Sequence, residues 1–203
     1  MPGLDALIPE VGDGRLVVAE SGADPAKSFF LRRLALTAAG HDYKVTFVTS
    51  RDRVELTRLL AQEGVSPPWH ESQFDIEERD SLLSLDEFVT VGGLLAVDSF
   101  SFLTLDLSPT QLAGLMRSVR TICAAQKTTV ILGTDRSMLD ARSDAVTWHL
   151  ADGVIQFHAK EGPEGVIRYI RIPKWMDGKF LDRNIYYGFD GSRLSIDLRR
   201  RVL

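Results

Sequence analysis

One short segment of the chain has the residue types and the order of a phosphate-binding loop. Residues 21–28 are Ser-Gly-Ala-Asp-Pro-Ala-Lys-Ser, and they follow the apolar run Leu16–Ala19. In this strand-to-helix setting, the pattern Gly-x-x-x-x-Gly-Lys-Ser/Thr places backbone N–H groups and the lysine against nucleotide phosphates. The Lys-Ser pair is present here, but serine and alanine occupy the two glycine positions. The candidate nucleotide-binding residues are Gly22, Ala23, Asp24, Ala26, Lys27 and Ser28.

Four residues of this loop are expected to weaken phosphate binding. Ala26 opposes the left-handed backbone that glycine adopts freely, and Ser21 adds a side chain where the backbone passes close to a phosphate. Asp24 brings a carboxylate near the phosphates, where like charge opposes binding. Pro25 lacks a backbone N–H group. The alternative is an ordinary strand-to-helix turn, in which the lysine and the serine only begin a helix.

An acid at the end of a second apolar run supplies a candidate magnesium ligand. Leu94–Asp98 is a continuous apolar run that is closed by a carboxylate. In phosphate-binding proteins such an acid holds magnesium beside the hydroxyl group of the loop. Ser28 and Asp98 are therefore the candidate metal ligands. The order of the segments, with a third apolar run that leads to Thr134 and Asp135, is more specific than either motif alone.

The elements that must position these residues alternate between apolar strands and helical patterns. Strands are predicted at 15–20, 45–49, 94–98, 129–132, 154–158, 166–172, 185–189 and 194–197, and helices at 27–39, 52–63, 84 onward, 109 onward and 137–150. Ser108, Pro109 and Gln111 form a helix-start signal. Continuous apolar strands joined by helices predict an α/β fold of three layers, with a mostly parallel central sheet and helices on both faces. The C-terminal strands are expected to extend this sheet antiparallel at one edge, within a single domain of residues 1–203.

Composition bounds the function classes. The 203 residues carry a net charge of −4, so charge gives no overall case for nucleic acid, and Arg199-Arg200-Arg201 is a local exception. The lone cysteine, Cys123, excludes an internal disulfide framework and is expected to be buried on a helix face. The four histidines lack metal-ligand spacing. No apolar run reaches membrane-spanning length, so we expect a cytoplasmic protein without membrane insertion.

With these motifs in place, the chain resembles the RecA superfamily and, within it, the single-domain KaiC-like proteins. The resemblance rests on five segments that span most of the sequence: Leu16–Ser28, Ala96–Ser101, Thr129–Thr134, Leu150–Ile155 with its Ala-Asp-Gly-Val-Ile strand entry, and Arg168–Pro173. The resemblance implies a RecA-like fold and an ATP or ADP site with magnesium at a subunit interface, in a homo-oligomer or in a hetero-oligomer with other RecA-like subunits.

Two departures from the family pattern bear on catalysis. KaiC-like ATPases carry glutamates after the second strand, which orient the attacking water, whereas this chain has Ser50 and Arg51 there. The family also sends a Lys-x-Arg pair into the phosphates of a neighbouring subunit. Here Lys174 is retained as a candidate interface phosphate contact, but Met176 replaces the arginine. No catalytic residue is therefore assigned.

Three functional hypotheses follow. The leading one is a catalytically degenerate KaiC/RecA-like protein that acts in regulation through assembly or partner binding, with weak nucleotide binding or none. The second is an ATP-binding regulator with slow hydrolysis, in which Asp135 or another acid replaces the missing base. The third is a DNA-binding recombinase paralogue, which the net charge of −4 does not favour.

Overall fold

The strands of the chain form one mixed sheet. The computed structural model describes residues 14–22, 24–65, 73–162, 165–176, 181–191 and 193–196. Within these ranges the strand order is β3-β2-β4-β5-β1-β6-β7-β8-β9. The strands are β1 (Leu16–Ser21), β2 (Val45–Thr49), β3 (Phe74–Glu78), β4 (Leu94–Val97), β5 (Thr129–Asp135), β6 (Gly153–Gly162), β7 (Gly165–Trp175), β8 (Leu181–Phe189) and β9 (Leu194–Ile196). In this spatial order, every neighbouring pair from β3 across the sheet to β6 is parallel. The pairs β6–β7, β7–β8 and β8–β9 are antiparallel.

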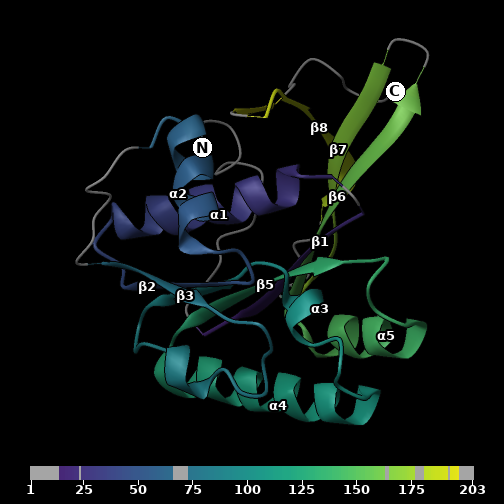
Figure 1. Ribbon diagram of the computed structural model, residues 1–203. Coiled ribbons are helices and arrows are strands. Elements are labelled where there is room, and N and C mark those ends of the chain that lie inside the picture. Colours follow the sequence, from purple (N-terminus) through teal and green to yellow (C-terminus); the bar gives the residue numbers. More distant parts are fainter. Residues whose placement is uncertain are drawn as a thin grey trace.

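Helices cover both faces of this sheet (Figure 1). The helical segments are α1 (Ala26–Ala39), α2 (Arg53–Gln62), the 3₁₀ turn η1 (Asp86–Phe88), α3 (Phe100–Leu103), α4 (Pro109–Gln126) and α5 (Ala141–Leu150). The first two helices pack on one face in one apolar cluster, and the last three lie on the opposite face, where a second cluster forms. This confirms the predicted three-layer α/β fold with antiparallel strands at one edge.

Local capping hydrogen bonds mark the starts of three helices. Ser108 and Gln111 form a complete capping box at the start of α4, with Pro109 at the first helical position. Asp52 caps α2 by accepting the N–H of Glu55, and Asp140 caps α5. The last helix therefore begins at Ala141, later than the predicted 137. None of the helices in the described ranges combines the length and the apolar character needed to cross a membrane.

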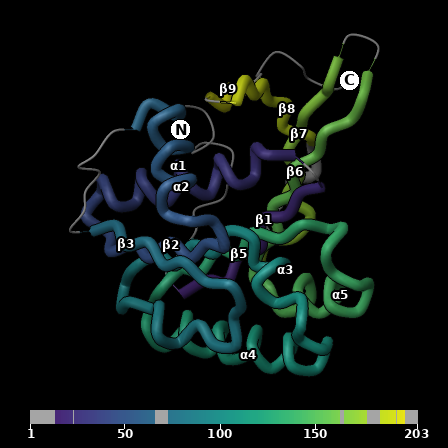
Figure 2. The backbone as a smooth tube through the Cα atoms, viewed as in Figure 1, coloured from purple at the N-terminus to yellow at the C-terminus, as the bar shows by residue number. Residues whose placement is uncertain are grey.

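Three elements differ from the prediction. Residues 74–78, where no strand was predicted, form the edge strand β3, and Phe100–Leu103 forms the short helix α3 soon after the predicted strand of Leu94–Asp98. The predicted helix from residue 84 is only the 3₁₀ turn η1. In Figure 2 the chain path places β2 and β3 at one side of the molecule and β6 to β9 at the other.

The parallel register brings the carboxyl ends of the central strands to a common edge. Ser21 at the end of β1 lies opposite Asp135 at the end of β5, and Val97 of β4 lies opposite both Val48 and Leu132. Ligands bind at this edge in open α/β sheets. Helix α1 packs closely on β5, because a Cβ added at Gly133 would lie 2.6 Å from the Leu31 side chain. This close packing holds the second turn of α1 against β5.

Candidate functional site

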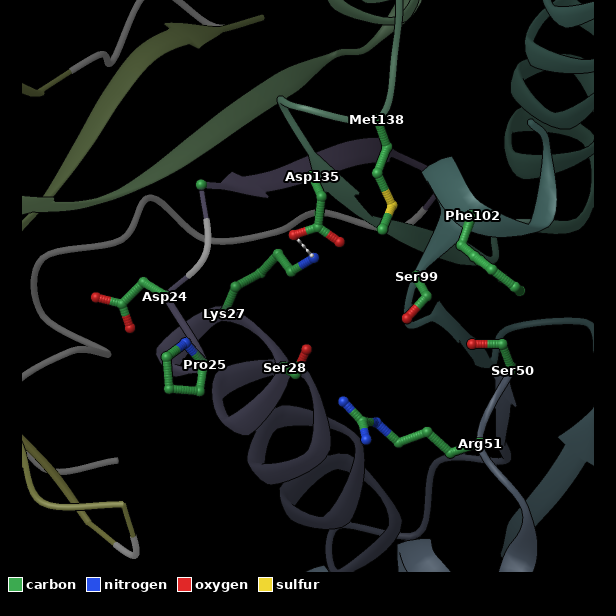
Figure 3. Close-up of a pocket in the computed structure, with 11 residues that line it drawn as sticks. Asp24, Pro25, Lys27, Ser28, Ser50, Arg51, Ser99, Phe102, Asp135 and Met138 are labelled. Atoms are coloured by element: carbon green, nitrogen blue, oxygen red, sulfur yellow. Dashed lines mark hydrogen bonds and ion pairs between the residues drawn. The ribbon is translucent and has the colours of Figure 1, made fainter.

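The loop between β1 and α1 is held by its own carboxylate. Asp24 accepts a hydrogen bond from the backbone N–H of Ala26 at 2.8 Å and one from Arg168 Nε at 3.1 Å. Only 3% of the Asp24 side chain is exposed. Figure 3 shows this carboxylate on the side of the loop away from the lysine ammonium. The acid thus occupies one loop N–H group, and the Arg168 guanidinium balances its charge.

The expected backbone penalty at Ala26 does not arise. Ala26 is the first residue of α1 and Pro25 before it is also helical, so neither needs a left-handed backbone. The described non-glycine residues with positive φ lie outside this loop. This corrects the expectation that alanine at this position opposes the loop conformation. Pro25 is the N-cap residue and, as predicted from its type, contributes no N–H group.

Lys27 is almost completely buried and points along the loop toward the end of β5. Its Nζ lies 2.9 Å from Asp135 Oδ1 and 3.3 Å from the carbonyl oxygen of Thr134. The exposed fraction of the lysine side chain is 2%. A buried ammonium needs such partners, since burial without them is strongly unfavourable. The Lys27 ammonium is therefore positioned to bind an anion, and here the Asp135 carboxylate holds it.

Ser28 and Asp98 form the second predicted contact. The Ser28 hydroxyl donates to Asp98 Oδ1 at 2.8 Å, although the residues lie 70 positions apart. Asp98 is fully buried, and its Oδ2 has no hydrogen-bond partner within the described residues. A buried carboxylate oxygen without a donor is costly unless a cation or a water satisfies it. The hydroxyl and this free oxygen are the oxygen ligands that magnesium prefers.

Lys27 and Ser28 line a cavity of about 440 Å³ (Figure 3). Its walls come from the loop, from the residues after β2, and from the segments after β4 and β5. They are lined by Gly22, Asp24, Pro25, Lys27, Ser28, Ser50, Arg51, Ser99, Phe102, Asp135 and Met138. Among the described residues, no cluster of three or more histidines, cysteines or acids could hold a metal by itself. A magnesium ion here would thus depend on Ser28, Asp98 and the oxygens of a bound phosphate.

The segment after β2 forms one wall of this cavity, and the residues that line it there are not acids that could serve as a general base. Ser50 and Arg51 line it, and the next acid, Asp52, instead caps α2 with its carboxylate 2.7 Å from the Glu55 N–H. Glu55 forms an ion pair with Arg51. The acids closest in sequence to the expected position of a general base are therefore engaged elsewhere.

A second cavity, of about 450 Å³, lies beyond the loop toward β6 and β7. It shares Gly22, Asp24 and Pro25 with the first, and its other walls are lined by Arg136, Phe157, His158, Ala159, Lys160, Glu161, Val166 and Arg168. Burial, together with the positive charges of Arg136 and Arg171, lowers the pKa of His158. The His158 ring stacks on Tyr169 with centroids 4.7 Å apart. The loop therefore separates two polar cavities.

Lys174 lies away from this edge of the sheet. It pairs with Val154 near the start of β6, toward the amino ends of β1 and β6. Its ammonium donates to the carbonyl oxygens of Trp148 and His149 at 2.8 and 2.9 Å, which caps the end of α5. Burial lowers the pKa of Lys174. The structure thus separates Lys174 from Lys27 within one chain, and a contact with the phosphates of a neighbour stays a prediction.

Sequence reasoning found some of the residues at this edge and missed others. Lys27, Ser28 and Asp98 are brought together as expected, and Ala23 lies outside the described residues. Arg168, Phe102 and Met138 were not anticipated as parts of the site. The contact of Arg168 with Asp24 spans 144 residues, so no local pattern announces it. Cys123 is buried on α4 as predicted, and Arg199-Arg200-Arg201 lies outside the described residues.

Comparison with known proteins agrees with the fold. No family model matches the chain, and no curated protein does. Among solved structures, the KaiC-like protein of the hyperthermophilic archaeon Pyrococcus horikoshii superposes with a TM-score of 0.79 at 20% identity, over 97% of this chain and 96% of that one. The flagellar accessory protein FlaH of Methanocaldococcus jannaschii gives a TM-score of 0.77 at 16% identity, over 93% of this chain and 91% of that one. The chain therefore has the RecA-like fold of KaiC-like proteins.

Proposed function

We propose that this chain is a catalytically degenerate RecA-like protein that binds a nucleoside polyphosphate weakly, with magnesium, and acts through assembly or partner binding. One observation carries the proposal. Lys27 and Ser28 line the cavity, and Ser28 donates to the buried carboxylate of Asp98 behind it, whereas an arginine lines the wall where a hydrolytic base would be required. Such a site can hold phosphates but lacks the group that activates water.

The binding chemistry comes from the first turn of α1. The N–H groups of a first helical turn have no partner within the helix, and the helix dipole favours an anion there. Lys27 supplies a positive charge beside them, and Ser28 with Asp98 supplies oxygen ligands for magnesium. Bound magnesium would neutralise phosphate charge. Two features lower the affinity, because Asp24 occupies the N–H of Ala26 and Pro25 has none.

Hydrolysis is expected to be slow or absent. A positioned general base contributes about 10²- to 10⁴-fold in rate, and an arginine supplied by a neighbour about 10³- to 10⁵-fold. Ser50 and Arg51 stand at the position of the first group, and Met176 at the position of the second. We infer that any nucleotide bound here acts as a signal and is not consumed.

A slow ATPase is the second candidate, because Asp135 is one of two acids that line the cavity, and the other, Asp24, is held by Ala26 and Arg168. Asp135 has a side chain that is 24% exposed, so water can reach it. Its Oδ1 is held by Lys27 at 2.9 Å, so one of its two oxygens is already engaged. DNA binding is supported by no observation comparable to these, and tight, salt-sensitive DNA retention on filters at low salt would reopen that hypothesis.

Apolar side chains beside the cavity support a role in assembly. Phe102, Leu105 and Met138 are 43%, 52% and 43% exposed, and the first and last of them line the cavity rim. Exposed apolar groups next to a polar site are typical of surfaces that a partner covers. We infer that these side chains are covered in a homo-oligomer, or in a hetero-oligomer with other RecA-like subunits.

Calorimetric titration with MgATP and MgADP tests this proposal, with phosphate release followed in the same solution. We expect weak binding to the wild-type protein, loss of binding in Lys27→Ala and Ser28→Ala, and no steady turnover. Lys44→Ala is the matched control, because that lysine is exposed. Absence of binding to the wild type would contradict the nucleotide part of the proposal. Steady turnover that Lys27→Ala abolishes would establish an ATPase instead.

A further inference from the structure

We propose that Arg51 binds the terminal phosphate of a nucleoside triphosphate and so makes the site distinguish triphosphates from diphosphates. The inference rests on the proposed function, because it assigns the ligand class of the same cavity. Arg51 stands where the KaiC-like sequence pattern has a glutamate.

The backbone directs Arg51 into the cavity. Position 51 follows the last residue of β2 by two, and its N–H donates to the Thr49 hydroxyl at 3.1 Å. Asp52 at the next position is the N-cap residue of α2, so the helix starts immediately after the arginine. Figure 3 shows the guanidinium pointing into the cavity from the wall across from Lys27, with Ser28 between them.

The guanidinium has donors to spare. An arginine side chain carries five N–H donors and cannot be deprotonated in a protein. Its Nη1 pairs with Glu55, while its Nε is buried and has no acceptor within the described residues. A buried donor without a partner is unfavourable. The ion pair with Glu55 leaves the arginine oriented, and 39% of its side chain stays exposed for an incoming anion.

A buried acceptor beside the same cavity is also unmatched. Oδ2 of Asp98 has no donor within the described part of the chain, and Asp98 is linked to the cavity wall through Ser28. A phosphate that carries a magnesium ion would satisfy both groups. The phosphate oxygens would accept from Arg51, and the magnesium ion would bind the free oxygen of Asp98. Phosphates held at the first turn of α1 beside Lys27 would face the wall that carries Arg51, so the guanidinium could reach the terminal phosphate.

The residue type also explains retention without turnover. A guanidinium forms strong, charge-assisted hydrogen bonds with phosphate oxygens, often two at once, but cannot accept a proton from water. A carboxylate at this wall would repel the terminal phosphate and activate water, whereas Arg51 attracts the phosphate and activates nothing. Affinity for the triphosphate state is therefore the property that this substitution favours.

Titration of the full chain with MgATP, its non-hydrolysable imido analogue and MgADP tests the inference. We expect Arg51→Ala to weaken binding of both triphosphates about 10- to 100-fold, as for one charged hydrogen-bonding group, and MgADP less than about threefold. Arg51→Lys keeps the charge but loses the planar fork, so an intermediate loss of triphosphate affinity is expected. Arg53→Ala is the matched control, because it removes the same charge two positions away, outside the cavity lining.

The outcomes separate this inference from the function on which it rests. Equal losses for triphosphate and diphosphate, or no loss for either, would overturn the role of Arg51 and leave the nucleotide site intact. Failure of the wild-type protein to bind any of the three nucleotides would overturn both. If Arg51→Ala does not fold, Arg51→Lys decides: a loss restricted to the triphosphates supports the inference, and unchanged affinity overturns it.

Discussion

The ammonium of Lys27 and the carboxylate of Asp135 lie 2.9 Å apart, across from each other at the ends of α1 and β5. The lysine side chain is 2% exposed and the aspartate side chain 24% exposed. Without a ligand, Asp135 supplies the negative charge that a bound phosphate would supply. The pair therefore stabilises the empty site and competes with the ligand for the same cation.

Replacing Asp135 tests this competition. We expect Asp135→Asn to lower the free energy of unfolding by about 1–3 kcal/mol, which is less than the loss of a whole buried pair because the amide oxygen can still accept from Lys27. The same change is expected to raise the affinity for MgATP several-fold. Urea unfolding and calorimetric titration measure the two effects. Asp106→Asn is the control for charge, since Asp106 is exposed. Weaker nucleotide binding in Asp135→Asn would contradict the competition.

The loop carboxylate gives a second prediction. Asp24 holds the Ala26 N–H and the Arg168 guanidinium, so Asp24→Asn removes a negative charge while keeping an acceptor. We expect nucleotide affinity to rise about 3- to 10-fold, while stability falls by about 1–2 kcal/mol through the weakened ion pair. Arg168→Gln is the opposing variant, because it leaves the charge of Asp24 unbalanced and should weaken binding. A shift of both variants in the same direction would show that loop charge does not control affinity.

Much of the fold could be predicted because the central strands are buried on both faces. Leu94–Val97 and Val45–Thr49 are continuous apolar or β-branched runs, which is the pattern of parallel strands under helices. The edge strand β3 lacks this pattern. It buries only Phe74 and Ile76 and exposes or half-buries its three acids, as edge strands often do. Its sequence therefore resembles a polar loop.

The site residues that belong to local sequence motifs could be predicted, whereas the contacts between segments far apart in the chain could not. The strand-to-helix sequence pattern predicts the meeting of Lys27, Ser28 and Asp98, because parallel strands bring their carboxyl ends to one edge of the sheet. The pairing of Asp24 with Arg168 depends on how β7 lies beside the loop, which no local pattern encodes. The helical backbone of Ala26 likewise depends on where α1 begins, and residue type alone suggested a penalty that the structure does not contain.

Lys174 gives a third prediction, in which stability and binding separate. Its ammonium donates to two carbonyl oxygens at the end of α5, so Lys174→Met is expected to lower the free energy of unfolding by about 1–3 kcal/mol. Nucleotide affinity of the dilute chain should not change, because Lys174 lies away from the loop. Chemical denaturation and titration check both statements. A loss of affinity that appears only at high protein concentration would instead support the predicted phosphate contact with a neighbouring subunit.

His158 gives a prediction for pH dependence. Burial, Arg136 and Arg171 lower its pKa below the ordinary value of 6.5, against a smaller opposing effect of Glu20, with Lys160 also lowering it. Below pH 6.5 the unfolded chain therefore binds a proton that the folded chain does not yet bind, and stability falls as the pH drops through this window. The loss levels off once the pH has passed the lowered folded pKa.

Urea unfolding between pH 5 and pH 7.5, a range of about one unit or more on each side of the ordinary value, should show this slope in the wild type. The slope should flatten in His158→Gln but persist in His41→Gln, which changes an exposed histidine. An unchanged slope in His158→Gln would assign the pH dependence to other groups.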